Sequence, residues 1–361
     1  MKHWQETSRV LQLLARLVEQ GRSAALATVV HVEGSAYRHP GARMLVDDSG
    51  ALTGTVSGGC LEADVREIAL SVIRDGVPQL LHYDTSDDAA PWGFGLGCYG
   101  AVDIFVQRAT TPEFLETFRK MMPLLEGDAA FAVSTIVRGP SGLGRSVIVE
   151  KNGPPICSTG DANLDRMIAA AASDVLDERV SQIRDLAKHR VFTDVQMPPP
   201  SLLVIGAGED TRPLVDFAKD VGFRVTVVDH RPQYLSASHY PSGTRLVKAR
   251  ADSDPLDLPL GPRAYAIVKT HSLEHDREWV GRLLASDVPY IGVLGSRARI
   301  DDVLRELGAE ENDRVFGPMG LDLGADGPEQ IAVSVVAELL AVVAGREPRH
   351  LRARVSAIHA G

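Results

Sequence analysis

The sequence predicts an α/β protein of two domains: an N-terminal α+β domain with an internal duplication, then a domain built on a doubly wound parallel sheet. Three observations predict this. A run of prolines at 198–200 interrupts the chain, and such a run ends a helix and stiffens a linker. One pattern of elements occurs twice before this run, and short apolar strands alternate with helices after it. We therefore expect domains at 1–196 and 197–361, in agreement with roughly 150 residues per domain.

The N-terminal domain is expected to open with an amphipathic helix that includes residues 11–18. A strand over 24–30 follows, and then a hairpin over 43–50, whose turn ends at Gly50. Glycine supplies the positive φ that such turns require. A glycine-rich turn then leads into a helix over 61–73. This order of helix, strand, hairpin and helix is the first copy of the repeat.

The second copy follows in the same domain. The aligned segments are 21–30 with 127–137, 43–50 with 145–153, and 57–60 with 158–161. Gly59 recurs as Gly160, whereas Asp161 replaces Cys60. A residue that the fold needs should occur in both copies. We therefore interpret the glycine as a requirement of the turn and the cysteine as an addition.

A long helix is predicted over 163–189, as the main part of a helical connector at 162–190. Its apolar residues recur at helical spacings. They are Met167, Ile168, Ala171, Val175, Val180, Ile183 and Leu186. This connector would join the duplicated part to the proline linker.

The C-terminal domain is expected to alternate strands and helices. The expected strands are 202–205, 224–228, 264–268 and 290–294, and the expected helices are 274–285, 298–307 and 328–343. Such alternation is typical of a parallel sheet that helices cover on both faces.

A dinucleotide-binding fingerprint is present in this domain in degraded form. Gly206 and Gly208 lie between the first strand and its helix, where glycines let backbone N–H groups approach a pyrophosphate. Asp229 ends the second strand at the position of a ribose-binding acid. Thr211 replaces the third glycine, and Arg231 leaves room for another phosphate. The pattern predicts a Rossmann-like domain and leaves open whether it binds NAD(P), another nucleotide or no dinucleotide.

His271 follows the third strand of this domain. Ligands of open α/β sheets bind at the carboxyl ends of the strands, so His271 is a candidate ligand contact. In an oxidoreductase it would be the candidate general base. A structural or capping role for this histidine stays open.

The turn before the helix at 61–73 is the sharper feature. Ser57, Gly58, Gly59 and Cys60 would present free N–H groups at the positive end of a helix dipole. Such a site binds anions, and the same field lowers the pKa of a thiol. Glu62 would orient the turn or compete with a bound anion. The alternative is that Cys60 is a small buried residue in a tight turn.

A second glycine-rich loop, 93–100, contains Cys98. Two cysteines flanked by glycines suggest a shared site, although no companion ligand has zinc spacing. Cys157, on the second hairpin, is interpreted as structural. Arg38 and Arg43 lie in a loop that would supply positive charge if it lay beside the Ser57 turn; the alternative is a solvated basic loop.

Composition excludes several function classes. Hydrophobic residues are 44% and charged residues 24%, as in ordinary globular proteins. A net charge of −10 and 5% aromatic residues disfavour nucleic-acid binding. Three dispersed cysteines indicate free thiols in a reducing compartment. The sequence shows no signal peptide and no apolar run of membrane-spanning length, so we expect a cytoplasmic protein without a membrane partner.

The chain resembles the XdhC/CoxI family, whose members are accessory proteins of molybdenum hydroxylases. The resemblance spans both domains. The segments that carry it are 34–44, 54–62, 92–100, 202–231, 270–276, 290–299 and 317–339. The turn Ser57–Cys60 together with the segment at 317–339 is more specific than any single glycine motif.

The resemblance implies an N-terminal XdhC-type domain and the role of a chaperone for molybdenum cofactor, a pterin with a dithiolene, a metal centre and a phosphate. Such a chaperone would help the cofactor acquire sulfur and insert it into a hydroxylase such as xanthine dehydrogenase. A cysteine desulfurase is a further implied partner, and a homodimer is expected from frequency alone. We expect Cys60 to contact molybdenum, aided by Cys98. The amides of Gly58 and Gly59, with Arg38 or Arg43, would hold anionic groups. Gly206, Gly208 and Asp229 would hold the nucleotide or pterin end of the cofactor. An NAD(P)-dependent oxidoreductase and a docking protein without cofactor are the alternatives.

Overall fold

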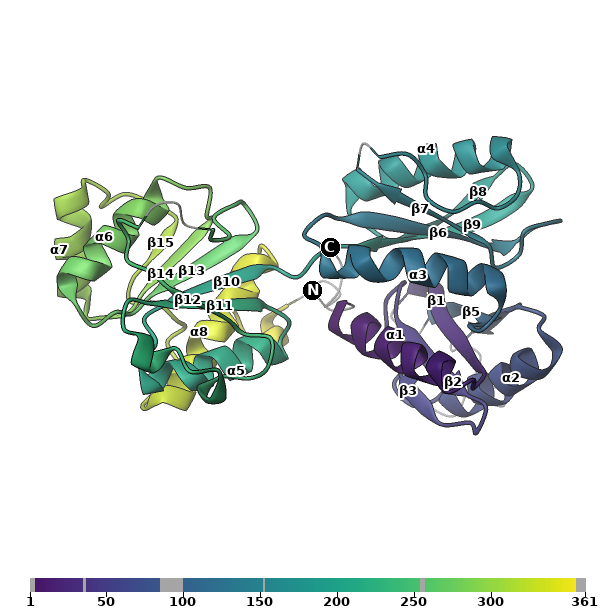
Figure 1. Cartoon of the computed structure of the whole chain (residues 1–361), viewed down its shortest axis with the longest axis horizontal. Coiled ribbons are helices and arrows are strands. Elements are labelled where there is room, and N and C mark those ends of the chain that lie inside the picture. Colours follow the sequence, from purple (N-terminus) through teal and green to yellow (C-terminus); the bar gives the residue numbers. More distant parts are fainter. Residues whose placement is uncertain (1–3, 35–36, 85–99, 152, 254–256, 355–361) are drawn as a thin grey trace. The chain divides into compact units, whose positions relative to one another are not determined.

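The computed structural model describes residues 4–34, 37–84, 100–151, 153–253 and 257–354 (Figure 1). The chain divides into two compact units, Met1–Pro198 and Pro199–Gly361. The division falls inside the run of three prolines. Each unit has its own sheets and its own core, and the two are described in turn.

The first copy in the first unit forms an antiparallel sheet of five strands in the order β3-β2-β1-β5-β4. Helix α2 covers one face of this sheet through Val65, Ala69 and Val72, which have helical spacing. The elements are α1 (Trp4–Glu19), β1 (Ala24–Gly34), β2 (Arg43–Asp47), β3 (Leu52–Gly54), α2 (Glu62–Asp75), β4 (Gln79–Asp84) and β5 (Gly100–Arg108).

The second copy forms a four-stranded sheet in the order β7-β6-β9-β8, which repeats the order β2-β1-β5-β4. A register shift falls at the same place in both sheets, at Val30 of β1 and at Val137 of β6. The predicted duplication is therefore confirmed at the level of topology. The elements are α3 (Pro112–Glu126), β6 (Phe131–Arg138), β7 (Ser146–Glu150), α4 (Ala162–Glu178), β8 (Gln182–Leu186) and β9 (His189–Gln196).

The predicted helix over 163–189 is wrong beyond Glu178. Arg179 adopts the left-handed conformation that ends α4, and the chain then forms the hairpin of β8 and β9. The apolar residues of this stretch fit a strand as well as a helix, because a short run has no unique period. Pairing of β9 with the central strand β6 decides in favour of the strand. The connector is thus the missing part of the second copy.

The two sheets of the first unit pack face to face. Val30 and Phe105 from the first copy meet Val137 and Phe192 from the second, and all four are buried. These are equivalent residues, since Val30 and Val137 lie at the matching register shifts and the two phenylalanines pair with Thr28 and Thr135. Helices α2 and α4 cover the outer faces. The unit is therefore a four-layer structure with approximate twofold symmetry.

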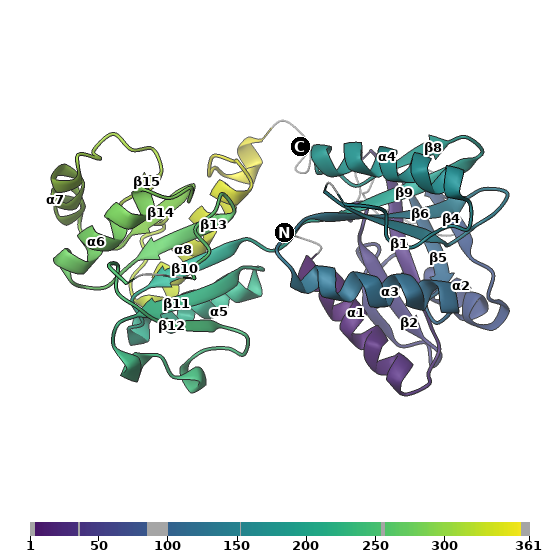
Figure 2. The same cartoon turned by 45° about the horizontal axis from the view of Figure 1, so that its top comes forward.

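The second unit has a parallel six-stranded sheet in the order β12-β11-β10-β13-β14-β15, which confirms the Rossmann-like, doubly wound prediction. Helices α6 and α7 lie on one face and α5 and α8 on the other (Figures 1 and 2). The elements are β10 (Ser201–Ile205), α5 (Arg212–Asp220), β11 (Arg224–Asp229), β12 (Arg245–Lys248), β13 (Ala264–Val268), α6 (Leu273–Leu284), β14 (Tyr290–Val293), α7 (Arg297–Leu307), β15 (Val315–Phe316) and α8 (Pro328–Val343).

The strand order reverses between β10 and β13. Loops from both strands leave the carboxyl edge of the sheet here, and this is the place where doubly wound folds bind ligands. Strands β12 and β15 were not predicted, because runs of four and two residues are too short to show a period.

Candidate functional site

One carboxylate holds the turn that precedes α2. Glu62 accepts hydrogen bonds from the backbone N–H of Ser57 at 2.9 Å and from the hydroxyls of Ser57 and Thr55. The Ser57 hydroxyl accepts from the N–H groups of Gly59 at 3.2 Å and Leu61 at 3.1 Å. Burial raises the pKa of Glu62, but the hydrogen bonds from Ser57 and Thr55 outweigh it and leave this pKa below its ordinary value. Ser57 and Glu62 therefore shape the turn and fix the direction of its backbone.

The second copy builds a similar turn, in which Thr159 and Asp161 replace Gly58 and Cys60. The Ser158 hydroxyl donates to Asp165 and accepts from the N–H of Gly160 at 3.0 Å, and Gly160 has positive φ as Gly59 does. Asp161 caps α4, because its carboxylate accepts from the N–H groups of residues 163 and 164. Cys60 aligns with Asp161, but α2 starts one residue later than this match, with Leu61 at its N-cap, and no side chain among the described residues caps it. The first copy thus has an exposed thiol where the second has a helix cap.

The loop between β1 and β2 lies beside this turn. The ring of Tyr37 lies against Gly58, since a Cβ on this glycine would be 3.5 Å from Cγ of the ring, at ordinary van der Waals contact. Arg38 pairs with Glu6 of α1, and the other oxygen of Glu6 accepts from the N–H of Thr55 at 3.3 Å. Arg38 is therefore next to the turn, with its charge balanced by Glu6.

Arg43 lies in the interior instead. Its Nη2 is 2.7 Å from Oδ2 of Asp194 on β9, and both side chains are buried. Within the described ranges, no acceptor contacts its Nε or Nη1. The pair joins β2 of the first copy to β9 of the second. The expectation that Arg43 holds an anion beside Ser57 therefore does not fit its placement, because its guanidinium is neutralised inside the unit.

The cysteines differ in exposure. Cys60 is exposed, and in the part of the chain that the structure describes no acceptor contacts the N–H groups of Gly58 and Cys60. Cys157 is half-buried near the second hairpin, where burial raises the pKa of its thiol. Cys98 lies outside the described residues, so its approach to Cys60 stays a prediction.

The glycine loop after β10 differs from a dinucleotide site. Gly206 has φ +110°, and a Cβ there would lie 2.3 Å from the carbonyl oxygen of Lys269, so only glycine fits. A Cβ on Gly208 would lie 2.6 Å from Oδ1 of Asp210. The buried Thr211 hydroxyl donates to the Gly206 carbonyl at 2.8 Å and locks the loop. Glu209 and Asp210 place two carboxylates at the start of the helix, where a pyrophosphate would need positive charge.

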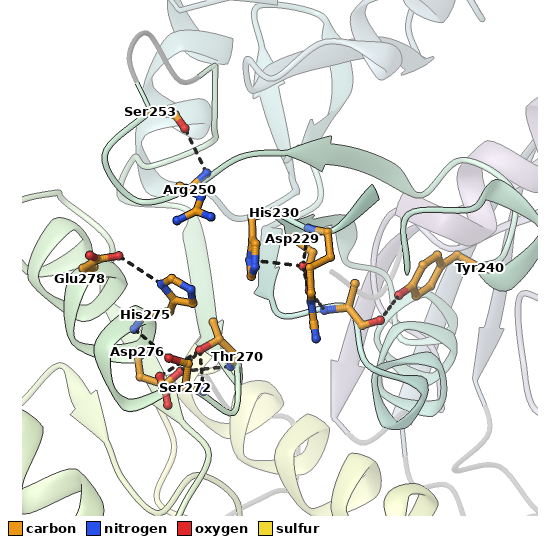
Figure 3. Close-up of polar contacts among 12 residues, drawn as sticks. Asp229, His230, Tyr240, Arg250, Ser253, Thr270, Ser272, His275, Asp276 and Glu278 are labelled. Carbon is orange, nitrogen blue, oxygen red and sulfur yellow. Dashed lines mark hydrogen bonds and ion pairs between the residues drawn. The ribbon is translucent and has the colours of Figure 1, made fainter. Parts of the chain in front are cut away.

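Asp229 is at the predicted position, and contacts within the protein occupy it (Figure 3). Its Oδ2 accepts from the N–H of Ala207 at 2.8 Å and from Nη2 of Arg231 at 2.9 Å. Its Oδ1 accepts from the N–H and Nε of Arg231. Burial raises the pKa of Asp229, but these hydrogen bonds outweigh it and lower the pKa to about 2. A ribose would have to displace Arg231 to reach this carboxylate.

A buried carboxylate also orients the loop after β13. Asp276 accepts from the N–H and hydroxyl of Thr270 at 3.0 and 2.6 Å (Figure 3). It also accepts from Nη2 of Arg299 at 2.6 Å. The next residue, His271, adopts φ +61°, which is uncommon outside glycine. Its imidazole is exposed, and Nε2 of the ring lies 3.6 Å from Oδ2 of Asp210. His271 thus lies on the loop after β13, near the glycine loop after β10.

Sequence reasoning missed several residues of this edge. His230 and His275 lie with ring centroids 4.9 Å apart beside Arg250, around a small pocket that Asp229 also lines (Figure 3). Lys269 is nearly fully buried and pairs with Asp210 at 2.8 Å. A lysine at the end of an apolar strand was the available signal for it. His230 follows β11 and His275 lies in the first turn of α6, so their spacing in the sequence left no signal.

Two features are absent from the described residues. They contain no group of three or more histidine, cysteine, aspartate or glutamate side chains placed to hold a metal ion. None of their helices combines the length and apolar character that crossing a membrane requires.

Family models match both units. The model of the XdhC and CoxI family matches residues 17–84, and the model of the XdhC Rossmann domain matches residues 202–339. The first match includes the Ser57–Glu62 turn. The second includes the glycine loop, Asp229 and the loop after β13.

Individual relatives agree with these models. A protein of Bacillus subtilis, named as a probable subunit of xanthine dehydrogenase, is 34% identical over 91% of this chain and 96% of its own. The Escherichia coli molybdenum cofactor insertion chaperone PaoD is 31% identical over 27% of this chain and 30% of its own. A crystal structure described as a xanthine dehydrogenase from Bacillus halodurans superposes with a TM-score of 0.77 and 28% identity, over 93% of this chain and 96% of that one. On these matches, the chain belongs to the XdhC and CoxI family.

Proposed function

We propose that this protein binds molybdenum cofactor and delivers it to a molybdenum hydroxylase of the xanthine dehydrogenase type. Two relatives support an accessory role, since one is named as a probable subunit of xanthine dehydrogenase and another as a molybdenum cofactor insertion chaperone. The match to the first relative runs through both units. The cofactor is the cargo of such a protein, and the hydroxylase is its partner.

The observation that carries the proposal is the difference between the two copies. Both copies hold a glycine turn with a serine and a carboxylate, so the turn itself belongs to the scaffold. Only the first copy replaces the capping carboxylate of Asp161 with the exposed thiol of Cys60. The fold does not need this thiol at that position, because the second copy folds without it.

The chemistry of the turn fits the cargo. A thiolate is a suitable ligand for a soft metal–sulfur centre. The uncapped start of α2 and the N–H groups of Gly58 and Cys60 suit an anionic group. The carboxylate of Glu62 repels a bound anionic group, but its hydrogen bonds with Ser57 and Thr55 direct this carboxylate into the turn.

Sulfuration is the finer part of the proposal. Among the described residues Cys60 is the exposed thiol. Its thiolate would attack the outer sulfur of a persulfide on a cysteine desulfurase, which forms a Cys60 persulfide and releases the desulfurase thiolate. Cys98 would assist from the loop that the structure does not describe.

The dinucleotide alternative lacks support at the glycine loop and at Asp229. Arg231 and the N–H of Ala207 occupy Asp229, and Glu209 and Asp210 bring negative charge to the helix start. Both features oppose a pyrophosphate and its ribose. We therefore do not propose NAD(P) as a cofactor.

The test is the metal and pterin content of the purified protein. The protein is produced with molybdate in a host that makes the cofactor. Molybdenum is then measured by mass spectrometry and pterin by fluorescence after oxidation. We expect near-stoichiometric amounts of both in the wild type, retention in Cys157→Ser, and loss in Cys60→Ser with unchanged circular dichroism. Full retention in both Cys60→Ser and Cys98→Ser would exclude the thiol site. Absence of both from the wild type, even after incubation with free cofactor, would overturn the proposed function.

A further inference from the structure

A second pocket opens at the carboxyl edge of the parallel sheet. It lies between α5 and α8 and encloses a cavity of about 100 Å³ within a wider opening of about 450 Å³ that includes space open to solvent. Its walls are apolar, and its polar lining is one pair, Asp210 and Lys269. The apolar wall residues are Leu214, Leu294, Met319, Ile331, Ala332 and Val335.

Lys269 is an unusual residue for this position. Only 3% of its side chain is exposed, and burying an ammonium is costly unless it is paired. Its Nζ lies 2.8 Å from Oδ1 of Asp210 and donates to the Thr211 hydroxyl at 2.8 Å. An ammonium has three N–H donors, and among the described residues only these two acceptors contact it. One donor is therefore left for an atom in the pocket.

Asp210 offers an acceptor beside that donor. Its Oδ1 contacts Nζ of Lys269. Its Oδ2 lies 3.6 Å from Nε2 of His271, which is beyond hydrogen-bond distance. About a third of the side chain is exposed, so Oδ2 is accessible from the pocket. The polar end of the pocket thus presents a carboxylate acceptor and an ammonium donor side by side.

The charges of this pair select the ligand. Asp210 neutralises Lys269, so a free phosphate or carboxylate gains little there. A flat neutral ring gains more binding free energy, because the apolar walls bury its two faces. If one edge of the ring carries donors and an acceptor, Asp210 can accept from the donors and Lys269 can donate to the acceptor. A 2-amino-4-oxopyrimidine has that edge: its ring N–H and amino group donate to a carboxylate, and its oxygen accepts.

We infer that this pocket binds the aminopyrimidinone edge of a pterin, with Asp210 accepting from the ring N–H and amino group and Lys269 donating to the ring oxygen. The inference rests on the proposed function, because a pterin is part of molybdenum cofactor. Guanine shares this edge, so the experiment must separate the two sources.

The experiment is a fluorescence titration of the full-length protein, freed of cofactor, with pterin and with lumazine, in which oxygen replaces the amino group. We expect wild type to bind pterin about ten- to a hundredfold more tightly than lumazine, and Asp210→Asn to lose most of this preference. Asp216→Asn is the matched control: it removes an exposed carboxylate from α5 and should keep the preference. A change in fold alone would weaken both ligands alike.

Three results would overturn the inference. The first is equal binding of pterin and lumazine by wild type, which needs no variant and so does not depend on folding. The second is an unchanged preference in Asp210→Asn. The third is tighter binding of GMP than of pterin, which would assign the pocket to a guanine nucleotide. The proposed function is judged separately: molybdenum and pterin retained through Cys60, together with no pterin preference in this titration, would leave the function standing and reject only this pocket.

Discussion

Replacing Arg43 with methionine should strongly destabilise the first unit. Arg43 and Asp194 are 7% and 6% exposed, and Nη2 of the arginine lies 2.7 Å from Oδ2 of the aspartate. Without Arg43 the carboxylate keeps only its hydrogen bonds from Ser181 at 2.9 Å and Gln196 at 2.7 Å. Removing one partner of a buried pair costs about 3–5 kcal/mol, because the other charge stays buried and uncompensated.

Hydrogen–deuterium exchange read by mass spectrometry is the suitable assay, because it follows β1 and β6 separately from the second unit. A loss of about 3–5 kcal/mol corresponds to roughly 100- to 4,000-fold faster exchange of amides that open only by unfolding. The double variant Arg43→Met with Asp194→Asn should exchange more slowly than Arg43→Met alone, since it removes both charges. Arg22→Met is the control, because Arg22 pairs with Asp48 at the surface. Less than tenfold acceleration in Arg43→Met would refute the reasoning and return Arg43 to the candidate ligands.

Two further predictions concern the second unit. The pKa of Asp229 is lowered to about 2, so the stability that it contributes is present above its ordinary pKa and is lost as the pH falls toward 2. Asp229→Asn should therefore melt at a lower temperature than wild type at pH 6 and at the same temperature near pH 2; a constant difference across this range would contradict the role of its charge. Gly206→Ala should lower the melting temperature of this unit, because its Cβ would lie 2.3 Å from the Lys269 carbonyl oxygen at φ +110°. Gly261→Ala, where nothing lies within 4 Å, is the control, and equal effects would show that the close contact relaxes without cost.

Local patterns were enough to predict much of the fold. Glycine turns, apolar periodicity and the proline run predicted the duplication and the parallel sheet. They failed over 179–189, where pairing with a distant strand decides between helix and hairpin. A period in a short segment does not contain that information.

The candidate site was predictable in position and less so in chemistry. The Ser57 turn and Asp229 lie where the motifs placed them. The roles of the two arginines depend on partners that lie far from them in the sequence. Glu6 pairs with Arg38, and Asp194 pairs with Arg43 across 151 residues. Lys269 meets Asp210 only because β10 and β13 are neighbours. Spacing along the chain cannot show such pairs.

The approximate symmetry of the first unit has a consequence for stoichiometry. Its two sheets meet through equivalent residues, Val30 with Val137 and Phe105 with Phe192, as the two halves of an isologous dimer do. A true dimer would have to carry every substitution twice. A single chain that contains both halves is free of this constraint, so one half keeps Asp161 as a cap while the other presents Cys60. Among the described residues, such a fused dimer presents one exposed thiol, on one of its two halves.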